Sequence, residues 1–250
     1  MVNNREDFAG IDKFRMAAAI MIIAIHTSPL LSVSREADFV LTRILARVAV
    51  PFFFMCTGYF LLPRCMESRV KGRSTLLRFL KKTGLLYAAA ILIYLPINVY
   101  SGYFKHKSIG FIIIKDLLFD GTFYHLWYIP ASIMGFLLVY TFWIKLSPKI
   151  VLSIASVLYL AGLFGDSYYG ISVKSVLLKN IYEAIFSAVN FTRNGLFFAP
   201  LFIVLGGLAA LYKKEYSIKF CAAGLSVSMT ALIAEGLILN RYSLQRHDSM

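Results

Sequence analysis

The chain has 250 residues, of which 59% are hydrophobic and only 16% are charged, and its mean hydropathy is +0.70. This composition excludes a soluble domain, whose surface would need more charged residues to face water. The formal net charge of +13 does not indicate nucleic-acid binding, because Lys and Arg lie between apolar runs. The charge is instead typical of membrane topology and of contact with anionic lipid.

Apolar runs that approach the ~20 residues needed to cross a bilayer recur along the chain. They lie at about 14–34, 39–62, 83–101, 126–144, 150–164, 194–212 and 220–239. The sequence therefore predicts an all-α, polytopic transmembrane helix bundle of about seven spans, forming one integral membrane domain over residues 1–250. The fifth run is short, so about six to eight crossings fit the pattern. The segment 110–124 is interrupted by charges and predicts an interfacial amphipathic helix or a half-helix.

Basic residues gather on one side of these runs. The segment 63–82 alone carries seven Lys or Arg, and residues 1–15 and 213–219 carry three each. By the positive-inside rule, these segments face the cytoplasm. We therefore expect a multi-pass protein of the cell membrane with a cytoplasmic N-terminus.

The three cysteines do not indicate chemistry. Cys56, Cys65 and Cys221 are odd in number, lie in or beside apolar segments and show no CxxC spacing. Packing is the favoured interpretation, and we expect neither a metal site nor a bound cofactor.

Ionisable residues at membrane depth are the candidates for function. Eleven positions on a helix separate Arg15 and His26 by about 16 Å, which places Arg15 at the inner interface and His26 deeper, toward the outer face. Five other polar residues are expected near the same outer level: His125, Asp166, Arg193, His247 and Asp248. Polar groups at this depth are costly unless they are paired or functional, so the shared level predicts a polar cavity.

The chemistry of that cavity would follow from its residue types. An imidazole accepts a proton from a hydroxyl at neutral pH, so His26 is a candidate base for attack of a hydroxyl on an activated acyl group. A structural explanation stands beside this one: His26 as a hydrogen-bonded helix residue, Arg15 as an interfacial anchor and His125 as part of an aromatic belt. Arg47 lies within an apolar run and needs a partner there, and Pro51 permits a kink.

Two motifs resemble a known family. “GIDKFRMAAAIMIIAIHT” resembles the opening of the acyltransferase-3 family of membrane proteins, in which an arginine, ten residues and a histidine mark the first helix; Arg15 and His26 match this pattern. “RVAVPFFFMCTGYFL” resembles the second-helix motif of that family, with Thr57-Gly58-Tyr59 where Ser-Gly-Phe is usual. The resemblance implies a fold of about ten helices, of which this chain would hold about seven and would be truncated at its C-terminus.

A narrower resemblance covers nearly the whole chain. “FYHLWYIPA”, “GLFGDSYYGI”, “TRNGLFFAPLF” and “RHDSM” together resemble the membrane half of the membrane-bound serine racemases of vancomycin-resistant enterococci, whose resistance concerns the cell wall. In those proteins a racemase domain that uses pyridoxal phosphate follows the membrane domain. Nothing here resembles that second domain, so we expect no pyridoxal phosphate in this chain and no racemase activity from it alone.

The two resemblances imply different functions. An O-acyltransferase would pass an acyl group from a cytoplasmic donor, typically acyl-CoA, to a hydroxyl acceptor at the outer face, with His26 as the catalytic base and Arg15 holding the donor. A delivery domain would bring L-serine to a racemase, with Arg47 or Arg193 binding the carboxylate and Asp166 or Asp248 the ammonium. A third hypothesis makes the domain a membrane anchor and dimerisation module, so a homodimer is one candidate assembly.

Overall fold

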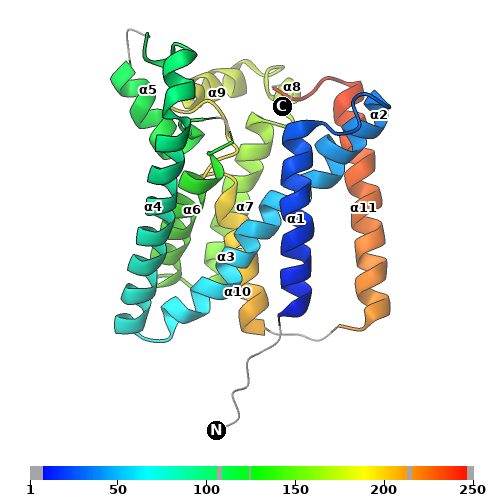
Figure 1. Ribbon diagram of the computed structural model, residues 1–250. Coiled ribbons are helices and arrows are strands. Elements are labelled where there is room, and N and C mark those ends of the chain that lie inside the picture. The colour runs from blue at the N-terminus through cyan, green and yellow to red at the C-terminus, as the bar shows by residue number, and fades with distance from the viewer. Residues whose placement is uncertain (1–7, 106–108, 124, 213–215, 247–250) are drawn as a thin grey trace. The chain divides into compact units, whose positions relative to one another are not determined.

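The computed structural model describes residues 8–105, 109–123, 125–212 and 216–246, and within these ranges the chain forms helices and turns only (Figure 1). It divides into two compact units. Of the described residues, unit 1 contains 8–53 and 216–241, and unit 2 contains 54–105, 109–123, 125–212 and 242–246. Each of the seven predicted apolar runs coincides with helical structure, which confirms the all-α membrane fold.

The helices of unit 1 come from both ends of the chain. They are α1 (Ala9–Thr27), α2 (Arg35–Asp38), the π-helical turn η1 (Phe39–Ile44), the 3-10 turn η2 (Leu45–Val48), the start of α3 (Ala49–Met66), and α11 (Ile218–Arg241). Helices α1 and α11 both pack against η1 and η2. Phe14 of α1 meets the edge of Phe52 with ring centroids 4.5 Å apart, and Gly236 of α11 lies against the side chain of Ile44.

The helical pitch of unit 1 changes in the residues that precede Pro51. Pro51 has no backbone N–H, so the carbonyl of Arg47 lacks its ordinary α-helical donor four residues on. The chain passes from a π-helical turn through a 3-10 turn at Leu45–Val48 before α3 begins at Ala49. Arg47 therefore lies in the irregular part of this span.

Unit 2 holds the remaining helices. They are the end of α3, α4 (Arg69–Tyr100), η3 (Tyr103–Lys105), α5 (Ile109–Lys115), η4 (Asp116–Asp120), α6 (Tyr128–Trp143), α7 (Pro148–Gly165), α8 (Tyr169–Ser172), α9 (Val176–Ala188) and α10 (Ala199–Tyr212). Helix α10 packs against α6 and α7, and α4 packs against α6. The short elements α5, α8 and α9 lie at one end of the unit, and α4 begins at the other (Figure 1).

Glycines let the helices of unit 2 approach closely. A Cβ on Gly58 of α3 would collide with the backbone carbonyl of Ile203, and a Cβ on Gly206 of α10 would collide with that of Met55. Both helices therefore touch backbone to backbone, which is the arrangement that small residues permit in membrane proteins. The predicted role of Gly58 in close helix approach is confirmed.

Four helical segments are long and apolar enough to cross a membrane: Arg35–Met66, Arg69–Tyr100, Pro148–Gly165 and Ile218–Arg241. Two shorter apolar helices, Tyr128–Trp143 and Ala199–Tyr212, lie where the fourth and sixth spans are predicted. The sixth is shorter than its apolar run because Asn194 holds the start of that run in a turn: its Oδ1 accepts the N–H groups of Leu196 and Phe197. Within the predicted interfacial segment 110–124, α5 and η4 together end at Asp120.

Candidate functional site

Arg15 and His26 lie on one unbroken helix in unit 1. Eleven residues amount to about three full turns, so the two side chains project from the same face of α1, about 16 Å apart along its axis. Arg15 is half-buried and its Nη1 forms an ion pair with Oδ1 of Asp12 at 2.9 Å. His26 is the second-to-last residue of the helix and is exposed.

The end of α1 that carries His26 is held in place by a buried acid. Ser28 follows the helix in a left-handed conformation, with φ of 44°, and its N–H donates to the carbonyl of Ala24. Asp38 is buried, and its Oδ1 accepts the N–H of Leu30 at 2.9 Å. The turn after His26 is thereby fixed to α2, which makes Asp38 a positioning residue that the sequence analysis missed.

In unit 2, the structure brings together Asp166 and Arg193. Asp166 follows α7, and Arg193 lies in the loop between α9 and α10. Their ion pair joins Nε of Arg193 to Oδ2 of Asp166 at 2.8 Å, with the side chains 30% and 15% exposed. The sequence analysis expects these two residues at one level, and here they are in contact. A guanidinium beside a carboxylate offers one group for each charge of a zwitterion.

Arg246 links Asp166 and the loop that carries Arg193 to a third segment. Its backbone N–H donates to the carbonyl of Asp166 at 3.0 Å, and its Nη1 donates to the carbonyl of Asn190 at 2.7 Å. The guanidinium stacks on the ring of Phe186 at 3.1 Å from the centroid. Because Asn190 is three residues before Arg193, these contacts close a ring: Asn190 to Arg193, then Asp166, then Arg246, then Asn190. The ring fixes the backbone on both sides of the ion pair.

Asp120 also holds the loop that carries Arg193. It ends η4, is buried, and its two carboxylate oxygens lie 3.0 and 3.2 Å from the backbone nitrogen of Asn190, which donates to them. Burial raises the pKa of Asp120 to about 6, and the N–H groups of Asn190 and Phe191 and the charge of Lys115 oppose that rise. Nζ of Lys115 also donates to Oδ1 of Asn190 at 2.7 Å. Asn190 is therefore bound at its N–H, its carbonyl and its side chain.

Asp116 forms a second buried acid one turn earlier. Tyr103 donates its hydroxyl to Oδ2 of Asp116 at 2.5 Å, and Tyr87 of α4 donates to the carbonyl of Asp116 at 3.4 Å. Burial raises the pKa of Asp116, which favours the protonated carboxyl more than in water. The residue thus joins η4 to η3 through its carboxylate and to α4 through its backbone carbonyl.

His125 lies in an aromatic environment. Its ring is 4.7 Å from that of Phe123 and 5.6 Å from that of Tyr94, both near edge-on. It follows the turn at Gly121, whose φ of 81° suits glycine, and precedes α6. This setting matches the aromatic-belt interpretation as well as a substrate contact.

The candidate residues are thus distributed over both units. Arg15, His26 and Arg47 belong to unit 1, and His125, Asp166 and Arg193 belong to unit 2. His247 and Asp248 lie outside the described residues. Three residues that the sequence analysis did not select also hold the unit 2 cluster together: Asp120, Asn190 and Arg246. Within the described ranges, no group of three or more His, Cys, Asp or Glu is arranged to hold a metal ion.

Comparison with known proteins covers almost the whole chain. The model of the acyltransferase 3 family, described as an acyltransferase domain, matches residues 8–245. An amino-acid racemase of Enterococcus faecalis is 48% identical over 256 residues, covering 100% of this chain and 34% of the relative. A serine/alanine racemase of Enterococcus gallinarum is 38% identical, covering 96% of this chain and 34% of the relative. The chain thus spans about a third of the length of these relatives. No solved structure gives a significant match.

Proposed function

The chain belongs to the acyltransferase 3 family of membrane proteins, and from this premise we propose that it transfers an acyl group from a cytoplasmic donor to a hydroxyl acceptor at the outer face. The observation that carries the proposal is the placement of Arg15 and His26 on the same face of one regular helix, about 16 Å apart. The matching arginine and histidine of the family pattern therefore project in one direction, as joint action on one extended donor requires.

The proposed reaction assigns a step to each residue. His26 takes the proton of the acceptor hydroxyl as its oxygen attacks the acyl carbonyl of a thioester donor such as acyl-CoA. The carbon–sulfur bond breaks, and the proton passes from the imidazole to the departing thiolate. Arg15 binds the phosphates at the other end of the donor, since a guanidinium forms paired hydrogen bonds with phosphate oxygens. Before the donor binds, Arg15 forms an ion pair with Asp12.

The test is acyl transfer by the full chain in proteoliposomes. Radiolabelled acetyl-CoA is supplied on the side of the N-terminus, L-serine is the trial acceptor, and thiol release is followed in parallel. We expect His26→Ala to lower the rate at least about 100-fold, because general-base catalysis contributes on this scale. Arg15→Ala should chiefly raise the KM for the donor. Thr27→Ala, next to His26, is the matched control and should retain activity. Equal rates in wild type and His26→Ala would contradict the proposal.

Delivery of an amino acid is the second candidate function, and the Asp166–Arg193 pair favours it. Each side chain is partly exposed, so a zwitterion has one partner for its carboxylate and one for its ammonium. The two relatives named above are racemases of amino acids. On this candidate, saturable uptake of radiolabelled L-serine into proteoliposomes is lost in Arg193→Ala and kept in His26→Ala. The opposite pattern supports acyl transfer.

We also propose that the protein lies in the cell membrane with its N-terminus in the cytoplasm, as the basic segment 63–82 indicates. Cysteine labelling of intact cells tests this orientation: a cysteine placed at Lys149 should be protected, and one placed at Lys174 should react. Both side chains are exposed. Should neither function be detected in folded protein, the anchor and dimerisation hypothesis gains weight.

A further inference from the structure

The end of α3 and the start of α4 carry a dense group of exposed basic side chains. Residues 64–82 include seven Lys or Arg, all of them exposed: Arg64, Arg69, Lys71, Arg73, Arg78, Lys81 and Lys82. Glu67 is the one acidic residue in this segment. No other part of the described chain concentrates charge of one sign so strongly.

The length of α4 places these residues at the surface of the bilayer. The helix has 32 residues, which corresponds to about 48 Å, whereas the hydrocarbon core is about 30 Å thick. The apolar run at 83–101 fills that core. The preceding part of the helix, about 20 Å long, therefore extends through the headgroup region on the side where α4 begins.

One face of this part of α4 is committed to protein contacts. The ring of Phe79 packs on Phe136 of α6 with centroids 5.1 Å apart, and Gly72 is buried against the backbone of Cys65. Tyr87, two turns further along, is also buried. At about 100° per residue, these three residues share one side of the helix.

The opposite side is both apolar and basic. Val70 is 82% exposed, Leu77 is 54% exposed and Leu85 is 68% exposed. Helical geometry places them in the same arc of about 140° as four basic residues: Lys71, Arg78, Lys81 and Lys82. Exposed aliphatic side chains among cations suit the boundary between acyl chains and headgroups, because long basic side chains extend their charges to the phosphates while their stems cover apolar surface.

We propose that this face of α4 binds the headgroups of anionic phospholipid in the leaflet where the helix begins, with Arg78, Lys81 and Lys82 contacting the lipid phosphates. The charge is complementary, and the aliphatic residues between the cations exclude a purely aqueous partner. The three cations fall within two turns, close enough to act on the same or adjacent headgroups.

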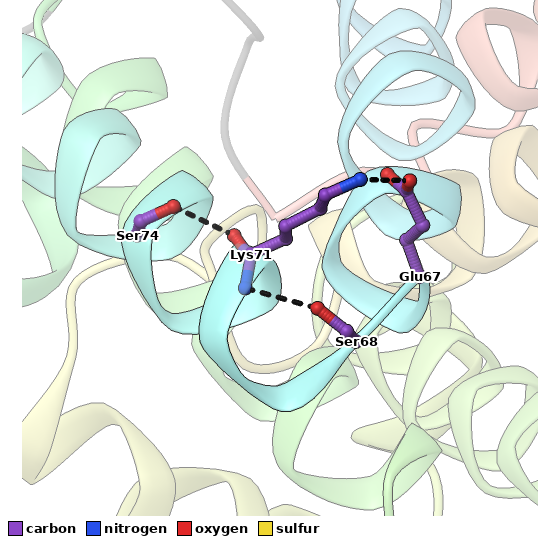
Figure 2. A network of polar contacts seen from close by, with 4 residues as sticks. All are labelled: Glu67, Ser68, Lys71 and Ser74. Atoms are coloured by element: carbon purple, nitrogen blue, oxygen red, sulfur yellow. Dashed lines mark hydrogen bonds and ion pairs between the residues drawn. The ribbon is translucent and has the colours of Figure 1, made fainter.

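Glu67 lowers the number of cations that this surface offers to lipid phosphates, because it pairs with Lys71 (Figure 2). Its Oε1 lies 2.5 Å from Nζ of Lys71 in an ion pair, and the backbone of Lys71 is held by Ser68, whose Oγ accepts its N–H, and by Ser74, whose Oγ donates to its carbonyl. Lys71 lies on the lipid-facing arc but is directed to the carboxylate. Removal of that carboxylate releases a fourth cation for phosphate.

The experiment measures lipid selectivity of the full chain in nanodiscs of phosphatidylcholine. Spin-labelled phosphatidylglycerol and spin-labelled phosphatidylcholine are compared by the motionally restricted fraction of each. The test variant is Arg78→Gln/Lys81→Gln/Lys82→Gln. The matched control, Lys145→Gln/Lys149→Gln/Lys219→Gln, removes the same charge from exposed lysines in other segments on the predicted cytoplasmic side. Circular dichroism and gel filtration verify that both remain folded.

We expect the test variant to lose preference for phosphatidylglycerol by at least about fivefold and the control by less than about twofold, since a basic residue near the surface contributes on the order of 1 kcal/mol. Glu67→Gln should raise the preference up to about fivefold by the same constant. The effects should shrink at high salt. Equal losses in test and control, no change in either, or displacement of the lipid by millimolar glycerol 3-phosphate would each overturn the proposal.

Discussion

Helices α10 and α11 are both strongly apolar, yet they are packed in very different ways. Helix α10 buries residues from its start as far as Gly207: Ala199, Pro200, Ile203, Val204, Gly206 and Gly207. Helix α11 buries only Leu239, although it is ten residues longer. One apolar helix is thus packed within unit 2, and the other is mostly exposed in unit 1. Apolar composition makes a helix suitable for the membrane, and the positions of small residues determine which other helices it can pack against.

Glycine substitution gives the largest expected contrast between the two helices. A Cβ on Gly206 would collide with the backbone carbonyl of Met55, whereas a Cβ on Gly224 of α11 would meet nothing within 4 Å. We expect Gly206→Ala to lower the free energy of unfolding by about 3 kcal/mol, because backbone must move. Gly224→Ala should change it by less than about 1 kcal/mol, with a gain favoured by helix propensity.

Thermal unfolding in detergent, followed by circular dichroism, measures both variants. Equal melting temperatures for Gly206→Ala and wild type would contradict the backbone contact between α3 and α10.

The second largest effect that we expect is a change in the free energy of unfolding with pH, caused by titration of Asp120 in unit 2. Its folded-state pKa of about 6 lies above the ordinary value of 3.8 because the carboxyl is buried. A raised carboxyl pKa contributes stability that is fully present below about pH 4 and is lost as the pH rises through about 6. We expect the loss to be on the order of 2 kcal/mol.

The measurement is the free energy of unfolding of wild type and Asp120→Asn between pH 4 and pH 7. The variant should lack this part of the pH dependence. Glu183→Gln, an exposed acid on α9, is the control and should follow wild type. Parallel curves for wild type and Asp120→Asn would show that Asp120 does not titrate in this window.

Arg246 provides the smallest of the three contrasts. Arg246→Gln removes the hydrogen bond to Asn190 and the stacking on Phe186, and we expect a loss of about 1–2 kcal/mol. Arg241→Gln, at the exposed end of α11 in unit 1, should cost less than about 0.5 kcal/mol. Hydrogen exchange at residues 189–194 should quicken in the first variant alone. Unchanged exchange there would rule out the ring of contacts around Asn190.

Much of the fold follows from the sequence, since each apolar run forms helix. Boundaries were less accurate: the third run begins at residue 83, but α4 begins at Arg69. A helix can continue outside the hydrocarbon core where its residues are basic and exposed. The change from apolar to basic residues therefore marks the end of the membrane-spanning part and not the end of the helix. The first residues of the sixth run form a turn instead of helix because the side chain of Asn194 bonds to the backbone there. A hydropathy profile does not detect such a local hydrogen bond.

The candidate site was predictable only in part. Asp166 and Arg193 were expected at one level because both flank predicted spans. The contacts that hold them were not, because Asp120 and Asn190 are 70 residues apart and Arg246 and Asn190 are 56 apart. A weak signal existed: Asp116 and Asp120 are four residues apart in an otherwise apolar segment, which places two acids on one helical face. The roles of Arg15 and His26 stay predictions.

The wide turn at Phe39–Ile44 sets the rotation of everything that follows it in that span. A π-helical turn holds more residues than an α-helical one, so side chains beyond it point in directions that a helical wheel drawn from Arg35 would assign to other positions. The face that presents Arg47 is therefore fixed by the local pitch and not by the residue count. An insertion or deletion upstream of Ala49 can change the pitch of this turn and so rotate the residues that follow it. Sequences of variants should therefore be aligned at this turn.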